Sequence, residues 1–143
     1  MRVIGFDPGT ATTGYGVVEG KGSRLRHIAH GVIRTPAGQP FAERLKTIFE
    51  EASRLLESFS PDAVAIEKLY FARNVTTGIN VAQARGVLAL TAARAGLFIG
   101  EFSPLEVKNA VVGYGKAEKR QVQEMIKILL KRIRSPRYVM LYM

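Results

Sequence analysis

The stretch Arg2-Val-Ile-Gly-Phe-Asp7-Pro-Gly-Thr10 decides how the rest of the chain is organised. Its apolar residues indicate a buried strand, and the Pro8-Gly9 pair indicates a turn directly after Asp7. We therefore expect Asp7 at the carboxyl end of a strand. In open α/β sheets this is the edge at which ligands and chemistry collect.

A second apolar run, Ala63-Val-Ala-Ile-Glu67, also ends in an acid that is followed by a loop. One such acid would most simply mark the point at which a strand reaches the surface. Two of them in one small domain favour a shared site, and clustered carboxylates suit a hard divalent cation such as Mg²⁺. Divalent ions held in this way catalyse phosphodiester hydrolysis.

The composition predicts one globular domain. Of the 143 residues, 47% are hydrophobic and 23% are charged, which is ordinary for a protein with a core. The sequence has no apolar run of membrane-spanning length and no signal-peptide pattern, so we expect no membrane association and a cytoplasmic location. The absence of cysteine excludes disulfides, thiolate zinc sites and a cysteine nucleophile.

The charge indicates a polyanionic partner. Lys and Arg total 21 against 12 Asp and Glu, which gives a net charge of +9. Nucleic acid is favoured over an anionic membrane, because the basic residues are spread over loops and helices and do not form one basic amphipathic helix.

The periodicity of apolar residues and the turn signals predict the remaining elements. A capping box at Ser103-Pro-Leu-Glu106 marks one helix start specifically. The expected elements are strands at 14–19, 25–35, 63–67 and 97–102, and helices at 45–59, at 77–95, from 104 to the glycines at 113 and 115, and from about 117. The helix at 77–95 is rich in small residues, so it could face the sheet, a partner subunit, or both.

These elements form a three-stranded meander followed by alternating strands and helices. A right-handed helical crossover can place the strand at 63–67 beside the first strand, which would make Asp7 and Glu67 neighbours. The predicted fold is therefore α/β and ribonuclease H-like, with a mixed five-stranded sheet flanked by helices. We expect a structural or exposed role for His27 and His30, both in the third strand.

Several motifs together resemble the RuvC family of Holliday-junction resolvases over nearly the whole chain. The first motif alone also resembles the phosphate-loop strands of actin-like ATPases. The matching stretches are Gly5-Phe-Asp-Pro-Gly9, Thr13-Gly-Tyr-Gly16, Ala65-Ile-Glu67, Tyr70-Phe-Ala-Arg-Asn74, Gln83-Ala-Arg-Gly86, Val107-Lys108, Val111-Val-Gly-Tyr-Gly115 and Ala117-Glu-Lys-Arg-Gln-Val122.

The resemblance implies a structure-selective endonuclease that resolves four-way junction DNA by metal-dependent paired nicking in recombination and repair. It implies Asp7 and Glu67 as catalytic metal ligands, Mg²⁺ as cofactor with Mn²⁺ as a possible substitute, a homodimer, and the RuvA–RuvB branch-migration complex as partner. The residues that it implies in DNA binding are Tyr70 or Phe71 (one of which stacks on bases), Arg73, Asn74, Lys108 and Lys119.

Each role has a simpler alternative. Tyr70 and Phe71 could belong to the core, and Lys108 and Lys119 could be solvated surface charges. For the whole chain, the alternatives are a non-catalytic junction-binding protein and a phosphate-handling ATPase domain. We disfavour the ATPase because the chain has no room for a second lobe over a nucleotide.

The carboxyl-terminal residues depart from the family pattern. The pattern expects Asp-x-Ala-Asp-Ala-Leu after the last helix, whereas the last acid here is Glu124. We therefore divide the chain into a nuclease domain at 1–131 and an atypical basic tail at 132–143. Either the reading frame is shifted, since the codons of residues 139–141 can spell Asp-Ala in another frame and Leu can follow, or the tail is a real divergence in a protein that binds junctions but cuts poorly.

Overall fold

The computed structural model describes residues 1–69 and 75–130. Within these residues the chain begins with a meander and then alternates strands with helices. The elements are β1 (Arg2–Asp7), β2 (Thr12–Lys21), β3 (Arg24–Arg34), α1 (Phe41–Phe59), β4 (Ala63–Glu67), α2 (Val75–Arg94), β5 (Phe98–Phe102), α3 (Pro104–Val112) and α4 (Lys119–Leu130).

The strands form one mixed sheet in the order β3-β2-β1-β4-β5. The meander strands β1, β2 and β3 pair antiparallel, while β1 pairs parallel with β4 and β4 parallel with β5. The predicted five-stranded sheet is confirmed, and so is the expected position of β4 beside β1. The crossover through α1 brings together the two strands that end in acids.

Alternation along β1 directs its side chains to two different cores. Ile4 and Phe6 are fully buried in the core that α1 and α2 cover, whereas Val3 packs in a second core with α3 and α4. Because strand side chains alternate with a period of two, Asp7 lies on the face of Val3. The carboxylate therefore projects on the side of α3 and α4, away from the larger core.

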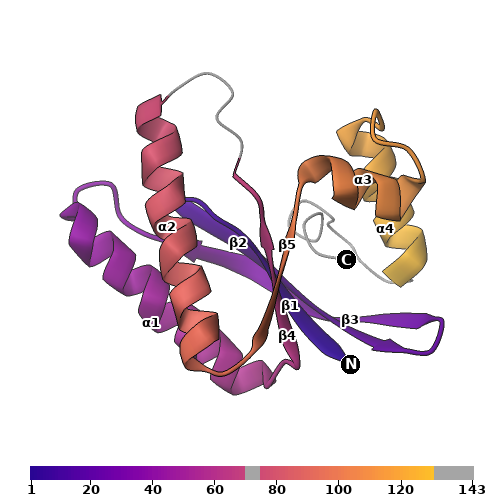
Figure 1. Ribbon diagram of the computed structural model, residues 1–143, viewed down its shortest axis with the longest axis horizontal. Coiled ribbons are helices and arrows are strands. Elements are labelled where there is room, and N and C mark those ends of the chain that lie inside the picture. The colour runs from indigo at the N-terminus through magenta and orange to yellow at the C-terminus, as the bar shows by residue number, and fades with distance from the viewer. Residues whose placement is uncertain (70–74, 131–143) are drawn as a thin grey trace.

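Helices α1 and α2 cover one face of the sheet (Figure 1). The spacing of Ile48, Ala52 and Leu56 places one side of α1 in the core, where α2 contributes Ala84, Leu88 and Ala92. Helix α1 ends at Ser60, which adopts the left-handed conformation with φ of 44°.

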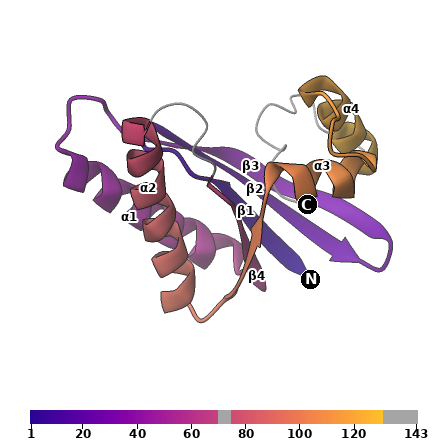
Figure 2. The ribbon, with the colours of Figure 1, turned by 45° about the horizontal axis from the view of Figure 1, so that its top comes forward.

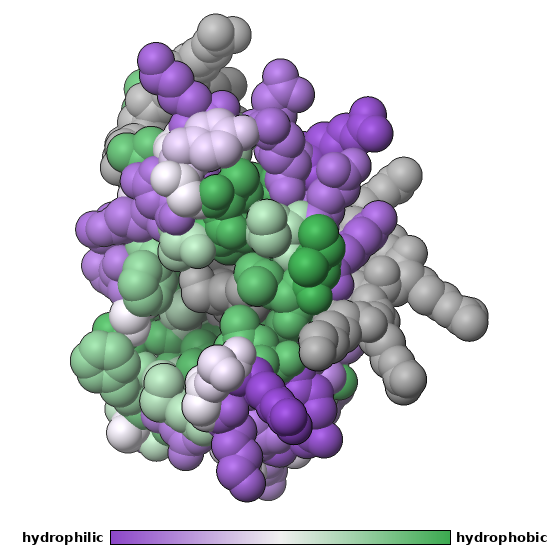
Figure 3. All heavy atoms as spheres, turned by 90° about the vertical axis from the view of Figure 1, so that its right-hand side faces the viewer, coloured by the Kyte–Doolittle hydropathy of each residue, from purple (hydrophilic) through white to green (hydrophobic). Residues whose placement is uncertain are grey.

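Helices α3 and α4 lie together at the opposite side, as the turned view also shows (Figure 2). Their apolar residues Val107, Val111, Val122 and Ile126 form the second core. Seen from this side, hydrophilic side chains border an apolar area (Figure 3).

The predicted capping box at the start of α3 is confirmed. The Glu106 main-chain N–H donates to Ser103 Oγ at 3.1 Å, and the Ser103 N–H donates to Glu106 Oε2 at 2.6 Å. Helix α3 ends at Gly113, whose φ of 94° favours glycine. This turn separates α3 from α4 as the sequence predicts.

The element boundaries differ from the predictions by a few residues. Helix α1 begins at Phe41, four residues before its apolar repeat. Strand β2 extends two residues beyond its predicted range at each end, and β3 begins and ends one residue earlier than predicted. A β-bulge shifts the register of the β2–β3 hairpin between Val17 and Val18. In residues 1–69 and 75–130, no helix is both long enough and apolar enough to cross a membrane.

Candidate active site

Asp7 and Glu67 lie side by side at the carboxyl ends of β1 and β4. The pairing of Phe6 with Ile66 sets this register, and the two acids come one residue later. Their carboxyl groups are joined by a hydrogen bond. They line a cleft of about 220 Å³ together with Pro8, Lys68, Leu69, Val81 and Pro104. The structure thus brings together the two acids that the sequence predicts as metal ligands.

The surroundings of the two carboxyl groups favour their protonated forms. Burial raises the pKa of Glu67 to about 7, and the hydrogen bond to Asp7 and the negative charge of Asp7 act in the same direction. Burial also raises the pKa of Asp7, against the hydrogen bond from Glu67 and the positive charge of Lys119. Of the two acids, Glu67 is therefore the one whose protonated form the pair favours.

The turn after Asp7 holds the end of β1 in place. Thr13 Oγ1 donates to the Gly9 carbonyl oxygen at 2.7 Å. A Cβ atom on Gly9 would lie 2.2 Å from the main-chain oxygen of Thr12, so a side chain there would displace the backbone. The Asp-Pro-Gly order therefore gives a tight turn that only glycine fits.

The two lysines predicted to bind DNA differ in their surroundings. Lys119, exposed at the start of α4, lies close enough to Asp7 for its charge to lower the pKa of that carboxyl group. Lys108 is half-buried in α3. The structure thus brings Lys119 to the carboxylate pair, while the DNA contacts of both lysines stay predictions.

Lys68 is a residue of the cleft that the sequence analysis missed. Its main-chain N–H donates to the Phe102 carbonyl oxygen at 2.8 Å, which extends the β4–β5 ladder, and its Nζ lies 3.9 Å from Glu106 Oε2. This long, partly exposed ion pair holds the ammonium group only weakly. Its position in the sequence directly after Glu67 could have identified Lys68 as a residue of the cleft.

The aromatic and polar loop predicted to contact DNA cannot be compared with the structure. Tyr70, Phe71, Arg73 and Asn74 lie outside the described residues, and so does the tail at 132–143. Their roles therefore stay predictions.

The donor set fits one hard cation. Two adjacent carboxyl groups in a cleft supply oxygen ligands, and Mg²⁺ commonly takes one or two carboxylates with waters and phosphate oxygens. In the part of the chain that the structure describes, no group of three or more His, Cys, Asp or Glu side chains could hold a metal. A second cation would need ligands beyond this pair.

The two histidines of β3 bond to each other. His27 Nε2 lies 2.8 Å from His30 Nδ1, and the rings are partly buried. Desolvation lowers the pKa of His27, with a smaller effect in the same direction from His30. Of the expected structural or exposed role, these contacts favour the structural alternative.

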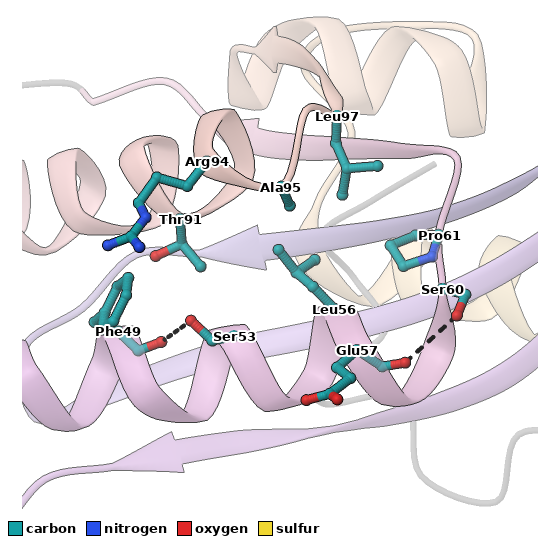
Figure 4. A pocket seen from close by; sticks show the side chains of 10 residues that line it. All are labelled: Phe49, Ser53, Leu56, Glu57, Ser60, Pro61, Thr91, Arg94, Ala95 and Leu97. Atoms are coloured by element: carbon teal, nitrogen blue, oxygen red, sulfur yellow. Dashed lines mark hydrogen bonds between the residues drawn. The ribbon is translucent and has the colours of Figure 1, made fainter.

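A larger cleft of about 390 Å³ lies between α1 and α2, away from the carboxylate pair (Figure 4). Its hydroxyl groups bond to their own helices: Ser53 Oγ donates to the Phe49 carbonyl oxygen at 2.7 Å, and Thr91 Oγ1 donates to that of Val87 at 2.7 Å. The Arg94 guanidinium stacks over the Phe49 ring at 5.5 Å. These groups stabilise helix packing, so the smaller cleft is the better candidate for chemistry.

The sheet order and the acids at the ends of β1 and β4 define a protein of the ribonuclease H-like class. A sequence profile described as "Crossover junction endodeoxyribonuclease RuvC" matches residues 3–139. The proteins of that name from Heliobacterium modesticaldum and Brevibacillus brevis are each 53% identical, covering 91% and 92% of this chain and 80% and 79% of their own lengths. The chain therefore belongs to the RuvC family of crossover junction endodeoxyribonucleases.

Solved structures agree with this assignment. Thermus thermophilus RuvC is 34% identical with a TM-score of 0.87, over 98% of this chain and 87% of that one. The same protein in complex with a Holliday junction substrate gives a TM-score of 0.90, over 96% and 84% of the two chains. The yeast mitochondrial Holliday junction resolvase Ydc2 shares the fold, with a TM-score of 0.63 at 18% identity over 90% and 62% of the two chains.

Proposed function

We propose that this chain cuts four-way DNA junctions with a divalent cation, Mg²⁺ or Mn²⁺ in its place, held between Asp7 and Glu67. The observation that carries the proposal is the pair of carboxyl groups at the adjacent ends of β1 and β4, which line one cleft. Family membership favours this nuclease function over the phosphate-handling ATPase.

The residues around the pair suit an anionic substrate. When bound, a divalent cation polarises a phosphodiester and activates water. Asp7 and Glu67 would supply the negative charge that holds such a cation, and Glu67 would bind it in the deprotonated form. Lys119 and Lys68 place ammonium groups near the carboxylates, where they can bind the phosphates on either side of the cut.

A dimer would place two such sites on opposed strands of one junction. Helix α2 supports a self-association face, because Val75, Ile79 and Leu90 are exposed along one of its sides. Gly86 lies on the same side, and a Cβ atom there would meet nothing within 4 Å. We propose this stripe as the homodimer face, and the RuvA–RuvB branch-migration complex as the partner of the dimer.

The acid content favours a second candidate, a junction-binding protein with impaired cutting. The described residues cluster two carboxylates, whereas two cations would need further carboxylate ligands. Residues 125–143 contain no acid. On this alternative, binding depends on the net charge of +9 and the basic side chains near the cleft.

An assay with four-way junctions and linear duplex of the same sequence separates these functions. We expect binding selective for the junction, and cutting of the junction in Mg²⁺ that EDTA abolishes. Selective binding without cutting would support the second candidate. Equal cutting of both DNAs, or cutting in EDTA, would contradict the proposed function.

A further inference from the structure

Arg85 of α2 lies against the main chain of Glu67. Its Nε donates to the Glu67 carbonyl oxygen at 3.3 Å, and its Nη2 donates to the Glu101 carboxylate of β5. The Arg85 side chain is only 22% exposed. One guanidinium group therefore bridges the last residue of β4 and the neighbouring strand, from the face of the sheet opposite to α3.

The Glu67 carbonyl group lacks the donor that a parallel ladder normally provides. The main-chain N–H of Lys68 donates to the Phe102 carbonyl oxygen, so the peptide groups of Lys68 point toward β5. Those of Glu67, one residue earlier, point toward β1. With Asp7 beside Glu67, the ladder donor for this carbonyl would be the next residue of β1, which is Pro8. Proline has no N–H group.

We propose that Arg85 is a positioning residue that replaces this missing donor and fixes the main chain at Glu67. A carbonyl group without a donor at the end of β4 would be free to rotate, and its residue carries one of the two carboxyl groups of the cleft. Glu101 orients the guanidinium group through a charge-assisted hydrogen bond. The inference rests on the proposed cation site. It deepens that proposal by naming a residue that contacts Glu67 from the opposite face of the sheet.

The simpler explanation is an ordinary ion pair between Arg85 and Glu101. Glu101 is 47% exposed, and such a pair contributes little to stability. That explanation predicts a small change in stability and no change at the cleft. The Nε bond to Glu67 separates the two explanations, because only a positioning role links Arg85 to the geometry of the carboxylate pair.

The test measures the Glu67 main-chain carbonyl and the cation separately. In Arg85→Gln we expect a changed ¹³C carbonyl chemical shift of Glu67 by NMR, and about tenfold or more weaker Mn²⁺ binding by electron paramagnetic resonance. Arg85→Lys keeps one donor and should recover part of both. The matched control is Arg94→Gln on the same helix, where the arginine stacks on Phe49; it should change neither readout.

Unchanged Mn²⁺ affinity and an unchanged Glu67 carbonyl shift in a folded Arg85→Gln protein would overturn the inference. If Arg85→Gln does not fold, Arg85→Lys and Glu101→Gln are measured in its place. An unchanged Mn²⁺ affinity and an unchanged Glu67 carbonyl shift in both variants would also overturn the inference. If the unsubstituted chain and Glu67→Gln bind Mn²⁺ alike, the proposed cation site fails instead. The carbonyl shift still tests the contact of Arg85 in that case.

Discussion

Among single residues, Glu67 sets the pH at which the pair can accept a cation. Its pKa of about 7 in the folded chain exceeds the usual 4.5, so between these values the folded state binds more protons than the unfolded state. In EDTA, stability should therefore fall as the pH rises from about 4.5 to about 7. Melting temperatures at several pH values measure this, with Glu67→Gln as the control that should lose this part of the pH dependence.

Cation binding should show the opposite pH dependence. Because a ligand carboxyl group must lose its proton, Mg²⁺ affinity should rise by at most about tenfold per pH unit below pH 7 and level off above it. Calorimetric titration of the chain with Mg²⁺ in buffers from pH 5.5 to 8 measures the change. An affinity that does not vary with pH would mean that cation binding does not require the deprotonation of Glu67.

Lys119 provides a separate prediction about DNA. If it contacts a phosphate, Lys119→Gln should weaken junction binding and reduce the dependence of log affinity on log salt by about 0.9 on duplex arms. Filter binding over a range of salt concentrations gives the slope. Lys127→Gln on the same helix is the control, since Lys127 lies in the last turn of α4. Equal slopes for both variants would mean that Lys119 is a solvated surface charge and does not contact a phosphate.

Among the elements, α3 depends on its capping box. Ser103→Ala removes the acceptor of the Glu106 N–H and should lower the free energy of unfolding by about 1 kcal/mol. Ser53→Ala is the matched control, because Ser53 sits inside α1 and its hydroxyl donates only to the carbonyl four residues earlier. Urea denaturation of both variants tests the difference. A loss as large in Ser53→Ala would mean that the cap is not the cause.

The elements also show how much the sequence could predict. The acids at the ends of two apolar runs and the rule of right-handed crossovers were enough to place Asp7 beside Glu67. The bulge at Val17 and Val18 was not predictable, because alternating apolar residues carry no sign of one extra residue. The first turn of α1 was missed because its residues before Leu45 are exposed or half-buried and do not follow the apolar repeat.

The contacts that surround the site were harder to predict. Arg85 and Glu67 lie 18 residues apart, and no periodicity shows which side chain of a helix meets a strand carbonyl. Pro8 was a usable signal, since it removes a donor from the ladder next to Glu67. The nearness of Lys119 to Asp7 came only from the family resemblance, because α4 reaches the cleft through tertiary packing.

At the scale of the whole molecule, we expect residues 1–143 to bind four-way junctions as a dimer and to cut them more slowly than a variant that carries the Asp-x-Ala-Asp motif. Asp7 and Glu67 can hold one cation, and the residues after Glu124 add no acid. Replacing residues 132–143 with a segment that carries the Asp-x-Ala-Asp motif should increase the cutting rate in Mg²⁺ with little change in affinity. Single-turnover cleavage of a junction measures the rate. Rapid resolution by the unmodified chain would contradict this prediction and direct attention to Glu118 and Glu124 as substitute ligands.

The central claim is that Asp7 and Glu67 together form the cation site of this molecule. Its most direct test is titration with Mn²⁺ followed by electron paramagnetic resonance, because the readout does not require cutting. Asp7→Asn and Glu67→Gln should each abolish the tightest Mn²⁺ binding while junction affinity stays the same or increases, since a negative charge near phosphate is lost. Glu51→Gln, at an acid of α1 that is paired with Arg54, is the control and should bind Mn²⁺ normally. Unchanged Mn²⁺ binding in folded Asp7→Asn and Glu67→Gln proteins would contradict the account.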